Sequence, residues 1–158
     1  MNPNLDKEIC EKYPKIFIER KLTAQESCMS WGFSHRDGWE WLLDKLCFFI
    51  QNRVDNDKNY VLDTQTNKYV GKAIDQVVIT TVKEKFGYLR IYHRGGDEVV
   101  RNAIDYTEFL SGFTCEFCGT TENIGKTKGW IKTCCKDCAD KEGFKGWRSS
   151  EKSIKPIV

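Results

Sequence analysis

The most regular pattern of apolar positions lies in residues 37–54. Apolar side chains recur there at intervals of three and four residues, which places them on one side of a helix. Either Ser34 or Asp37 can cap the start of this segment. The pattern therefore predicts a helix over 37–54 with one apolar face. The residues of that face are Leu42, Leu43, Leu46, Phe49, Ile50 and Val54.

Two further helices are predicted, one on each side of the first. The helix on the N-terminal side covers residues 4–12, with Asn4 as its cap and Tyr13-Pro14 as its end. The other begins at Asp97-Glu98, runs to about Ser111, and has Gly112 as a stop signal. Its apolar stripe consists of Val100, Ala103, Ile104, Thr107 and Leu110.

Two neighbouring stretches have the composition of β-strands. Residues 74–82 are rich in β-branched side chains, and residues 88–93 alternate. Residues 83–87 lie between them, and Gly87 can adopt a turn conformation that other residues resist. The pattern predicts a β-hairpin.

The remaining stretches of the N-terminal half are less regular. A short strand is predicted over 16–18, and a buried turn or strand over 29–33. Residues 55–72 are polar and are predicted to form a loop with at most a short strand over 60–62.

Together these elements predict an α+β fold, in which an antiparallel hairpin or small sheet packs on two helices. A C-terminal zinc-ribbon or treble-clef-like finger follows. The predicted organisation is a core domain over 1–112, a finger over 113–143 packed on the core, and a basic, flexible tail over 144–158.

Composition narrows the class of protein. The chain has 158 residues, and its longest apolar run is too short to cross a membrane. Its first residues are polar and lack the apolar stretch of a secretory signal, so we expect a cytoplasmic protein. Residues 126–158 carry nine basic and four acidic side chains. Such a basic end suits a polyanionic partner, although a solvated, lysine-rich tail has the same composition.

Four of the eight cysteines form two matched pairs. Two residues separate the members of each pair, and sixteen residues separate the pairs. This spacing is typical of a zinc site, and four thiolates close its tetrahedral shell, leaving no position for water or substrate. The sequence therefore predicts one structural Zn²⁺ per chain. Its ligands are Cys115, Cys118, Cys135 and Cys138.

Several alternatives remain open for this segment. Cys134 can replace Cys135 as a ligand, iron can replace zinc, and the four thiols can be unliganded or redox-active. Gly125 and Gly129 favour a hairpin between the pairs, and residues 137–141 favour a helix after them.

Basic and aromatic side chains are interleaved in two other segments. One contains Arg36, Asp37 and Trp39, and the second spans residues 82–92. Such a mixture can hold phosphates and stack on bases, whereas for any single residue an ordinary cross-strand pair on a solvated hairpin is the simpler explanation. In the second segment the candidate ligand-binding residues are Lys83, Lys85, Arg90 and Tyr92.

Familiar catalytic patterns are missing. The His-x-Glu motif and the Pro-Cys-x-x-Cys pair of zinc deaminases do not occur. Glycine-rich phosphate loops and nucleophile elbows do not occur either. An enzyme would have to rely on carboxylates such as Asp37 and Glu84.

Several motifs resemble those of small uncharacterised proteins encoded by tailed bacteriophages and related prophages. The resemblance covers roughly residues 28–140 and implies a phage protein that acts in the host cytoplasm, with no assigned activity. Cys134 departs from the pattern, where an apolar residue is expected. The motifs are Trp31-Gly32-Phe33, Asp37-Gly38-Trp39, residues 83–90, Cys115-Glu116-Phe117-Cys118-Gly119 and residues 129–138.

Three functional hypotheses follow. The first is a non-enzymatic, zinc-stabilised protein that binds nucleic acid or a phosphorylated small molecule through the basic and aromatic hairpin. The second is a protein–protein inhibitor of a host or anti-phage defence enzyme, because exposed aromatic residues anchor protein interfaces. The third is a carboxylate-based hydrolase. The anchors in the second hypothesis are Trp39, Trp41, Phe86 and Trp147.

Overall fold

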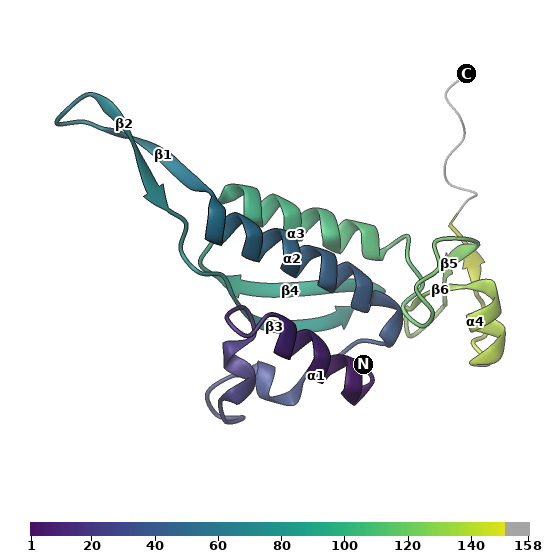
Figure 1. Ribbon diagram of the computed structural model, residues 1–158. Coiled ribbons are helices and arrows are strands. Elements are labelled where there is room, and N and C mark those ends of the chain that lie inside the picture. The colour runs from purple at the N-terminus through teal and green to yellow at the C-terminus, as the bar shows by residue number, and fades with distance from the viewer. Residues whose placement is uncertain (151–158) are drawn as a thin grey trace, which may run out of the picture.

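The predicted central hairpin lies at the middle of an α+β fold (Figure 1). The computed structural model describes residues 1–150. In it β3 (Val78–Lys85) pairs with β4 (Tyr88–Arg94) in antiparallel register. Phe86 and Gly87 form the turn, with φ of 55° and 76°. Two left-handed residues are what a tight hairpin turn requires. The turn is thus shorter than predicted, and residues 74–77 precede the strand rather than belong to it.

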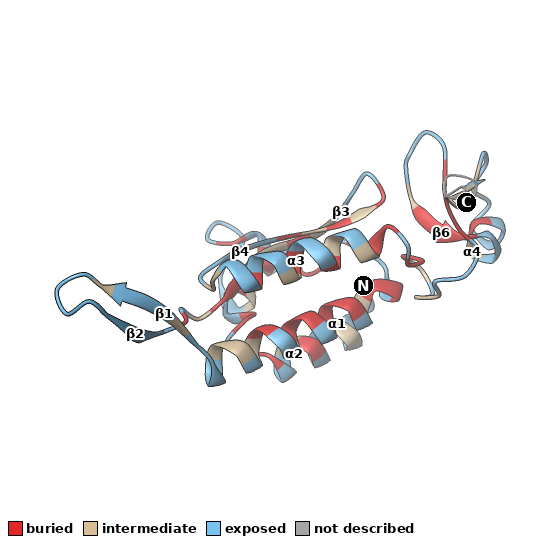
Figure 2. Cartoon of the chain, turned by 90° about the horizontal axis from the view of Figure 1, so that it is seen from above, coloured by how far each residue is buried: buried red, intermediate tan, exposed pale blue. Residues whose placement is uncertain are grey.

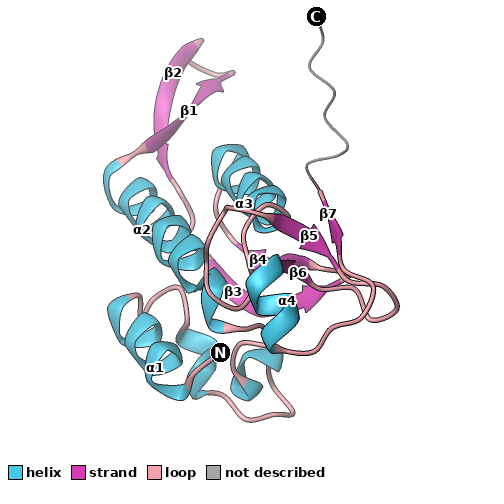
Figure 3. Ribbon diagram, turned by 90° about the vertical axis from the view of Figure 1, so that its right-hand side faces the viewer, coloured by secondary structure: helices cyan, strands magenta, loops and turns pink. Residues whose placement is uncertain are grey.

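Two helices cover one face of this hairpin (Figures 1 and 3): α2 (Glu40–Asn56) and α3 (Glu98–Ser111). Both predicted helices are confirmed, and Asp97 caps α3 by accepting a hydrogen bond from the Val100 N–H at 3.0 Å. The predicted cap of α2 is wrong. No side chain caps it, and Asp37 instead accepts a 2.6 Å hydrogen bond from the backbone N–H of Asn2.

The first helix, α1 (Pro3–Lys12), packs beside α2. Its cap is Asn2, not Asn4, because the Asn2 side chain accepts from the Asn4 N–H at 2.9 Å. Tyr13 follows the helix, and its hydroxyl lies 2.9 Å from the Asp44 carboxylate. The apolar core joins these elements. Its fully buried members include Ile9, Ile16, Met29, Trp39, Leu43, Ile50, Val82, Leu89 and Val100.

The strand predicted over 16–18 is wrong. Residues 14–17 form turns, and short 3-10 helices follow at Ile18–Lys21 and Cys28–Trp31. The Ile16 carbonyl accepts one hydrogen bond, from the Ile79 N–H at 3.0 Å. The segment thus joins the edge of β3 by one backbone hydrogen bond instead of a ladder, while its apolar side chains still enter the core.

The predicted loop over 55–72 contains a second hairpin, formed by β1 (Lys58–Asp63) and β2 (Lys68–Ala73). It projects away from the core beyond the end of α2 (Figures 1 and 2). We call residues 58–73 the arm. The short strand predicted over 60–62 lies within β1. Almost all residues of the arm are exposed on both faces, so the rest of its sequence has no apolar alternation that indicates a strand.

A small sheet forms the C-terminal finger, in the order β6 (Thr133–Cys135), β5 (Ile124–Lys126), β7 (Arg148–Ser149). Helix α4 (Lys136–Lys141) follows β6. The beginning of the predicted tail therefore belongs to this unit, because β7 pairs with β5, and Phe144 and Trp147 pack on its apolar cluster. Residues 151–158 lie outside the described residues.

Across residues 1–150, none of the helices has both the length and the apolar character that a membrane crossing requires.

The His35 imidazole is buried within the core, and it provides a test of the fold. Burial lowers its pKa from 6.5 to about 4, so protons bind the unfolded chain more tightly than the folded one. Above pH 6.5 the residue is neutral in both states. Stability should fall by about 1.4 kcal/mol per pH unit as the pH drops from 6.5 towards 4. Urea unfolding of wild type and His35→Phe across this range measures the contribution, and parallel pH profiles would contradict it.

Candidate metal centre

The first cysteine pair lies in a tight turn that follows α3. The Gly119 N–H donates to the Cys115 carbonyl at 3.0 Å, and the Cys115 N–H donates to the Thr120 carbonyl at 2.8 Å. Gly119 has φ of 78°, a conformation that glycine adopts without a steric penalty. The turn directs the sulfurs of Cys115 and Cys118 to the same side.

The second pair lies where β6 meets α4. Cys135 ends the strand and caps the helix, since its sulfur accepts from the Cys138 N–H at 3.4 Å. Cys134 points to the other side of β6, as strand alternation requires. It is buried, its carbonyl accepts from the Trp147 indole N–H at 3.0 Å, and burial raises its pKa to about 12. Cys134 is therefore a buried neutral thiol.

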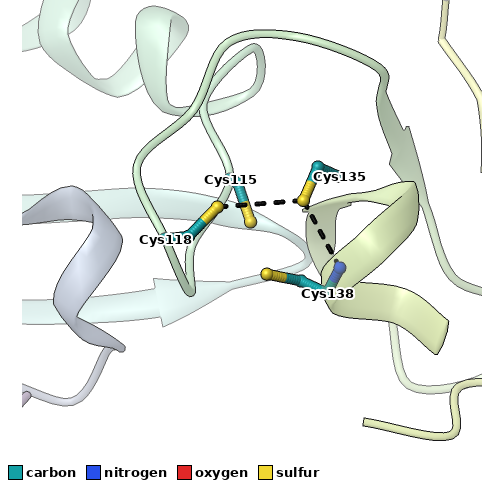
Figure 4. A group of neighbouring side chains, drawn as sticks. All are labelled: Cys115, Cys118, Cys135 and Cys138. Atoms are coloured by element: carbon teal, nitrogen blue, oxygen red, sulfur yellow. Dashed lines mark hydrogen bonds between the residues drawn. The ribbon is translucent and has the colours of Figure 1, made fainter. Parts of the chain in front are cut away.

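The four predicted ligands come together in space (Figure 4), although the pairs are far apart in sequence. The sulfurs of Cys115, Cys118, Cys135 and Cys138 all lie within 4.8 Å of one another. Tetrahedral zinc with Zn–S bonds of about 2.3 Å would hold its sulfurs about 3.8 Å apart. The sulfurs of Cys118 and Cys135 are 3.8 Å apart. The cluster can thus hold one metal ion, and Cys134 is not part of it.

The electrostatic interactions among these four thiols also favour a bound cation. Burial opposes ionisation at Cys115, but backbone N–H groups of Cys118, Cys135 and Phe117 outweigh it and lower the pKa of this thiol. Burial and the neighbouring thiols raise the pKa of Cys138. Four thiolates at this spacing repel one another unless a cation neutralises them. The donor set therefore fits a divalent metal ion that prefers sulfur.

The finger is fixed to the core through the Asp37-Gly38-Trp39 segment. The Gly38 N–H donates to the Glu116 carbonyl at 2.9 Å. A Cβ atom on Gly38 would lie 2.2 Å from the Cys115 carbonyl oxygen, so no larger residue fits there. The Trp39 indole N–H donates to the Thr114 carbonyl at 2.9 Å. These contacts place the first cysteine pair directly against the core.

A buried group of charges forms the second contact between finger and core. The Lys132 ammonium lies 2.7 Å from Glu84 on β3 and 3.1 Å from Glu116. The side chains of the lysine and of Glu84 are 16% and 10% exposed, and that of Glu116 is 1% exposed. Burial raises the pKa of Glu116, while the charge of Lys132 opposes this rise. Beside them, the Thr133 hydroxyl donates to the Gly87 carbonyl at 2.5 Å.

The predicted ligand-binding residues fall into two groups. Strand alternation places Lys83, Lys85, Arg90 and Tyr92 together on the face of the hairpin opposite the core residues Val82, Leu89 and Ile91. We call this the outward hairpin face. The Arg90 guanidinium is paired with Glu108 at 2.6 Å, so its charge is partly neutralised.

The Arg36, Asp37 and Trp39 segment behaves differently. Arg36 and Asp37 are exposed and line a cavity of about 430 Å³ beside Cys118 and Cys138. The prediction that Trp39 contacts a ligand is wrong, because its side chain is completely buried. The apolar part of its ring packs in the core, and its indole N–H donates to the backbone beside the first cysteine pair.

The hydrolase hypothesis and the protein–protein inhibitor hypothesis lose part of their support. Glu84 and Asp37 line different cavities, and Glu84 is engaged by Lys132 and by the Gly87 N–H at 2.7 Å. Of the proposed aromatic anchors, Trp39 is buried and Trp147 packs within the finger, whereas Trp41 and Phe86 are 40% and 69% exposed.

Sequence reasoning missed three residues on the finger. Lys126 lies 3.6 Å from the centre of the Tyr88 ring, beside the outward hairpin face. Trp130 is 80% exposed and lines a cavity of about 310 Å³ together with Lys85 and Phe86. Lys132 bridges two glutamates that are distant in sequence. The exposed Trp130 beside Gly129 offered a local signal, but the two lysines did not.

Comparison of the chain with protein-family models, curated proteins and solved structures gave no match. Its site must therefore be interpreted from its own geometry.

Proposed function

We propose that this chain is a non-enzymatic, zinc-stabilised module that binds single-stranded nucleic acid through the outward hairpin face. The observation that carries the proposal is the close association of cations with aromatic rings there. The Lys83 ammonium lies 5.2 Å from the centre of the Tyr92 ring, and Lys126 lies 3.6 Å from Tyr88. Proteins that bind single strands combine basic grooves with aromatic stacking platforms in this way.

The tip of the hairpin supports a preference for single strands over duplexes. Phe86 and Trp130 are 69% and 80% exposed, and both line the cavity beside Lys85. Unpaired bases offer flat faces to such rings, whereas the bases of a duplex are already stacked. A phosphorylated small molecule would engage the same lysines without needing several aromatic rings.

In this proposal the metal is zinc, and its role is structural. All four positions of a tetrahedral shell would be occupied by cysteine. The ion would therefore hold the finger against the hairpin and would have no free position at which to catalyse a reaction of the bound nucleic acid. The resemblance to tailed-phage proteins extends the proposal to binding in the cytoplasm of an infected host.

Fluorescence anisotropy with a labelled oligothymidylate tests this proposal. Each phosphate contact to a single strand contributes about 0.7 to the slope of log K against log salt. We expect Lys83→Gln/Lys85→Gln to reduce the magnitude of this slope by about 1.4, since two phosphate contacts are lost, and to weaken binding at low salt. The matched control is Lys7→Gln/Lys15→Gln, which removes the same charge from exposed positions near α1.

A small-molecule site would leave the oligonucleotide unbound. Equal losses in the two double variants, or binding that does not respond to salt, would contradict the proposal.

A further inference from the structure

Three residues at one level of the finger sheet have their side chains on the same face. Strand β5 lies between β6 and β7 (Figure 3), and register places Thr133 opposite Lys126 and Lys126 opposite Arg148. Thr133 is completely buried, Lys126 is half-buried and Arg148 is exposed. The row therefore begins inside the protein and ends in water. We call these three residues the finger row.

The finger row meets the outward hairpin face at the hairpin turn. At its buried end the Thr133 hydroxyl donates to the Gly87 carbonyl. The Lys126 ammonium lies 3.6 Å from the centre of the Tyr88 ring, and the Arg90 guanidinium lies 5.6 Å from the same ring. Tyr88 thus joins a cation of the hairpin to a cation of the finger. Neighbouring strands are about 4.8 Å apart, so the exposed end of the row lies about 10 Å from its buried end.

The two cations of the finger row stand together without an acidic partner. Lys126 and Arg148 are directly opposite each other, and like charges in such positions repel. Within residues 1–150 neither side chain forms an ion pair. An anion held between them would remove this repulsion. A phosphate suits both side chains, because a guanidinium can bind it through two parallel N–H groups and an ammonium binds it as a point charge.

The backbone around Arg148 is held in place by the finger itself. A Cβ atom on Gly125 would lie 2.2 Å from the Arg148 carbonyl oxygen and 2.5 Å from the Trp147 ring, so only glycine lets β7 approach β5 this closely. The Trp147 indole N–H donates to a backbone carbonyl of β6 at 3.0 Å. The Ser150 N–H donates to the Ile124 carbonyl at 2.9 Å. Because this backbone is already fixed, a ligand has to order only the side chains of the row.

We propose that the finger row is a second phosphate-binding site for the same nucleic-acid strand. The strand runs from the outward hairpin face past Tyr88 onto the finger sheet, where Lys126 and Arg148 hold its phosphates. This inference rests on the proposed nucleic-acid binding and deepens it, because it makes the finger part of the binding surface. The finger then contributes charges to the interface as well as its contacts with the core.

Fluorescence anisotropy with the labelled oligothymidylate, repeated over a range of salt concentrations, tests this path. We expect Lys126→Gln/Arg148→Gln to reduce the magnitude of the slope of log K against log salt by about 1.4, since two phosphate contacts are lost. Combining these changes with Lys83→Gln/Lys85→Gln should reduce it by about 2.8, because one strand contacts both sites. Circular dichroism and zinc content show that the variants compared are equally folded.

Two controls separate the charge of the row from the charge and the fold of the finger as a whole. Lys141→Gln/Lys145→Gln removes two exposed charges from α4 and the segment after it, outside the finger row, and should leave the slope near that of wild type. Arg148→Lys keeps the charge of the row, so its slope should also stay at the wild-type value. A slope reduced as much in either control as in Lys126→Gln/Arg148→Gln would overturn the proposal.

The path and the proposed function can fail separately. If Lys83→Gln/Lys85→Gln reduces the slope and Lys126→Gln/Arg148→Gln does not, the strand binds the hairpin alone and the finger row is not a binding site. If wild type does not bind the oligothymidylate at all, the proposed function fails, and the path fails with it.

Discussion

Replacing Cys135 with serine is expected to remove the metal and unfold the finger while the core stays helical. The substitution removes one of four sulfurs within 4.8 Å of one another, while the serine hydroxyl can still cap α4, so the effect isolates the loss of the metal ligand. Structural zinc contributes about 10–16 kcal/mol of binding free energy in zinc-finger peptides, and this energy is folding energy. The finger has only short strands and one short helix, so it has little else to hold it together.

Elemental analysis of purified protein measures this effect directly. Wild type should contain about one zinc per chain, and Cys135→Ser should contain much less. Cys28→Ser is the matched control, because this cysteine is exposed and lies outside the cluster. Full zinc content in Cys135→Ser, or metal-free wild type with a folded finger, would refute the structural metal site. Iron in place of zinc would appear in the same measurement.

Replacing Lys132 with methionine is the second change expected to have a large effect. Methionine keeps much of the length of the side chain but leaves Glu84 and Glu116 buried and close together without a cation. Removing one partner of a buried ion pair costs about 3–5 kcal/mol. The loss should therefore appear as a large decrease in the free energy of unfolding, with the finger released from the hairpin.

Urea unfolding of the zinc-loaded protein measures this loss. Lys128→Met is the control, since it changes an exposed lysine in the same loop and should have little effect. Lys132→Met/Glu84→Gln should recover part of the stability, because it removes one of the two uncompensated charges. If the single variant is as stable as the control, the buried charges do not join the finger to the core.

The parts of the fold that were predictable have local causes. Helix α3 is predictable because Asp97 can cap its start and because its apolar residues form a stripe on one side of the helix. The two cysteine pairs are predictable for a similar reason, since the spacing within each pair is set by the turn that presents both sulfurs to one ion. The same rule favours Cys135 over Cys134, and strand alternation explains why Cys134 lies apart from the cluster.

The rest depends on contacts between distant residues. Trp39 could be read as an exposed aromatic because nothing in its neighbourhood reveals that Thr114, far along the chain, accepts its indole N–H. Lys132 and Glu84 are likewise 48 residues apart. Only the short strand over 60–62 of the arm was predicted, for another reason: with both faces in water, the rest of the arm lacks the apolar alternation by which a strand is recognised.

The close contact at Gly38 has a consequence for the order in which the protein is made. Gly38, Trp39, Glu84 and Gly87 all precede the first cysteine of the cluster in the chain. Domains generally fold from the N-terminal side during synthesis. The ribosome therefore releases the cysteine pairs after the core residues that receive them. Zinc capture then follows the folding of the core, and a shortage of zinc would leave a folded core with an unfolded finger rather than an unfolded chain.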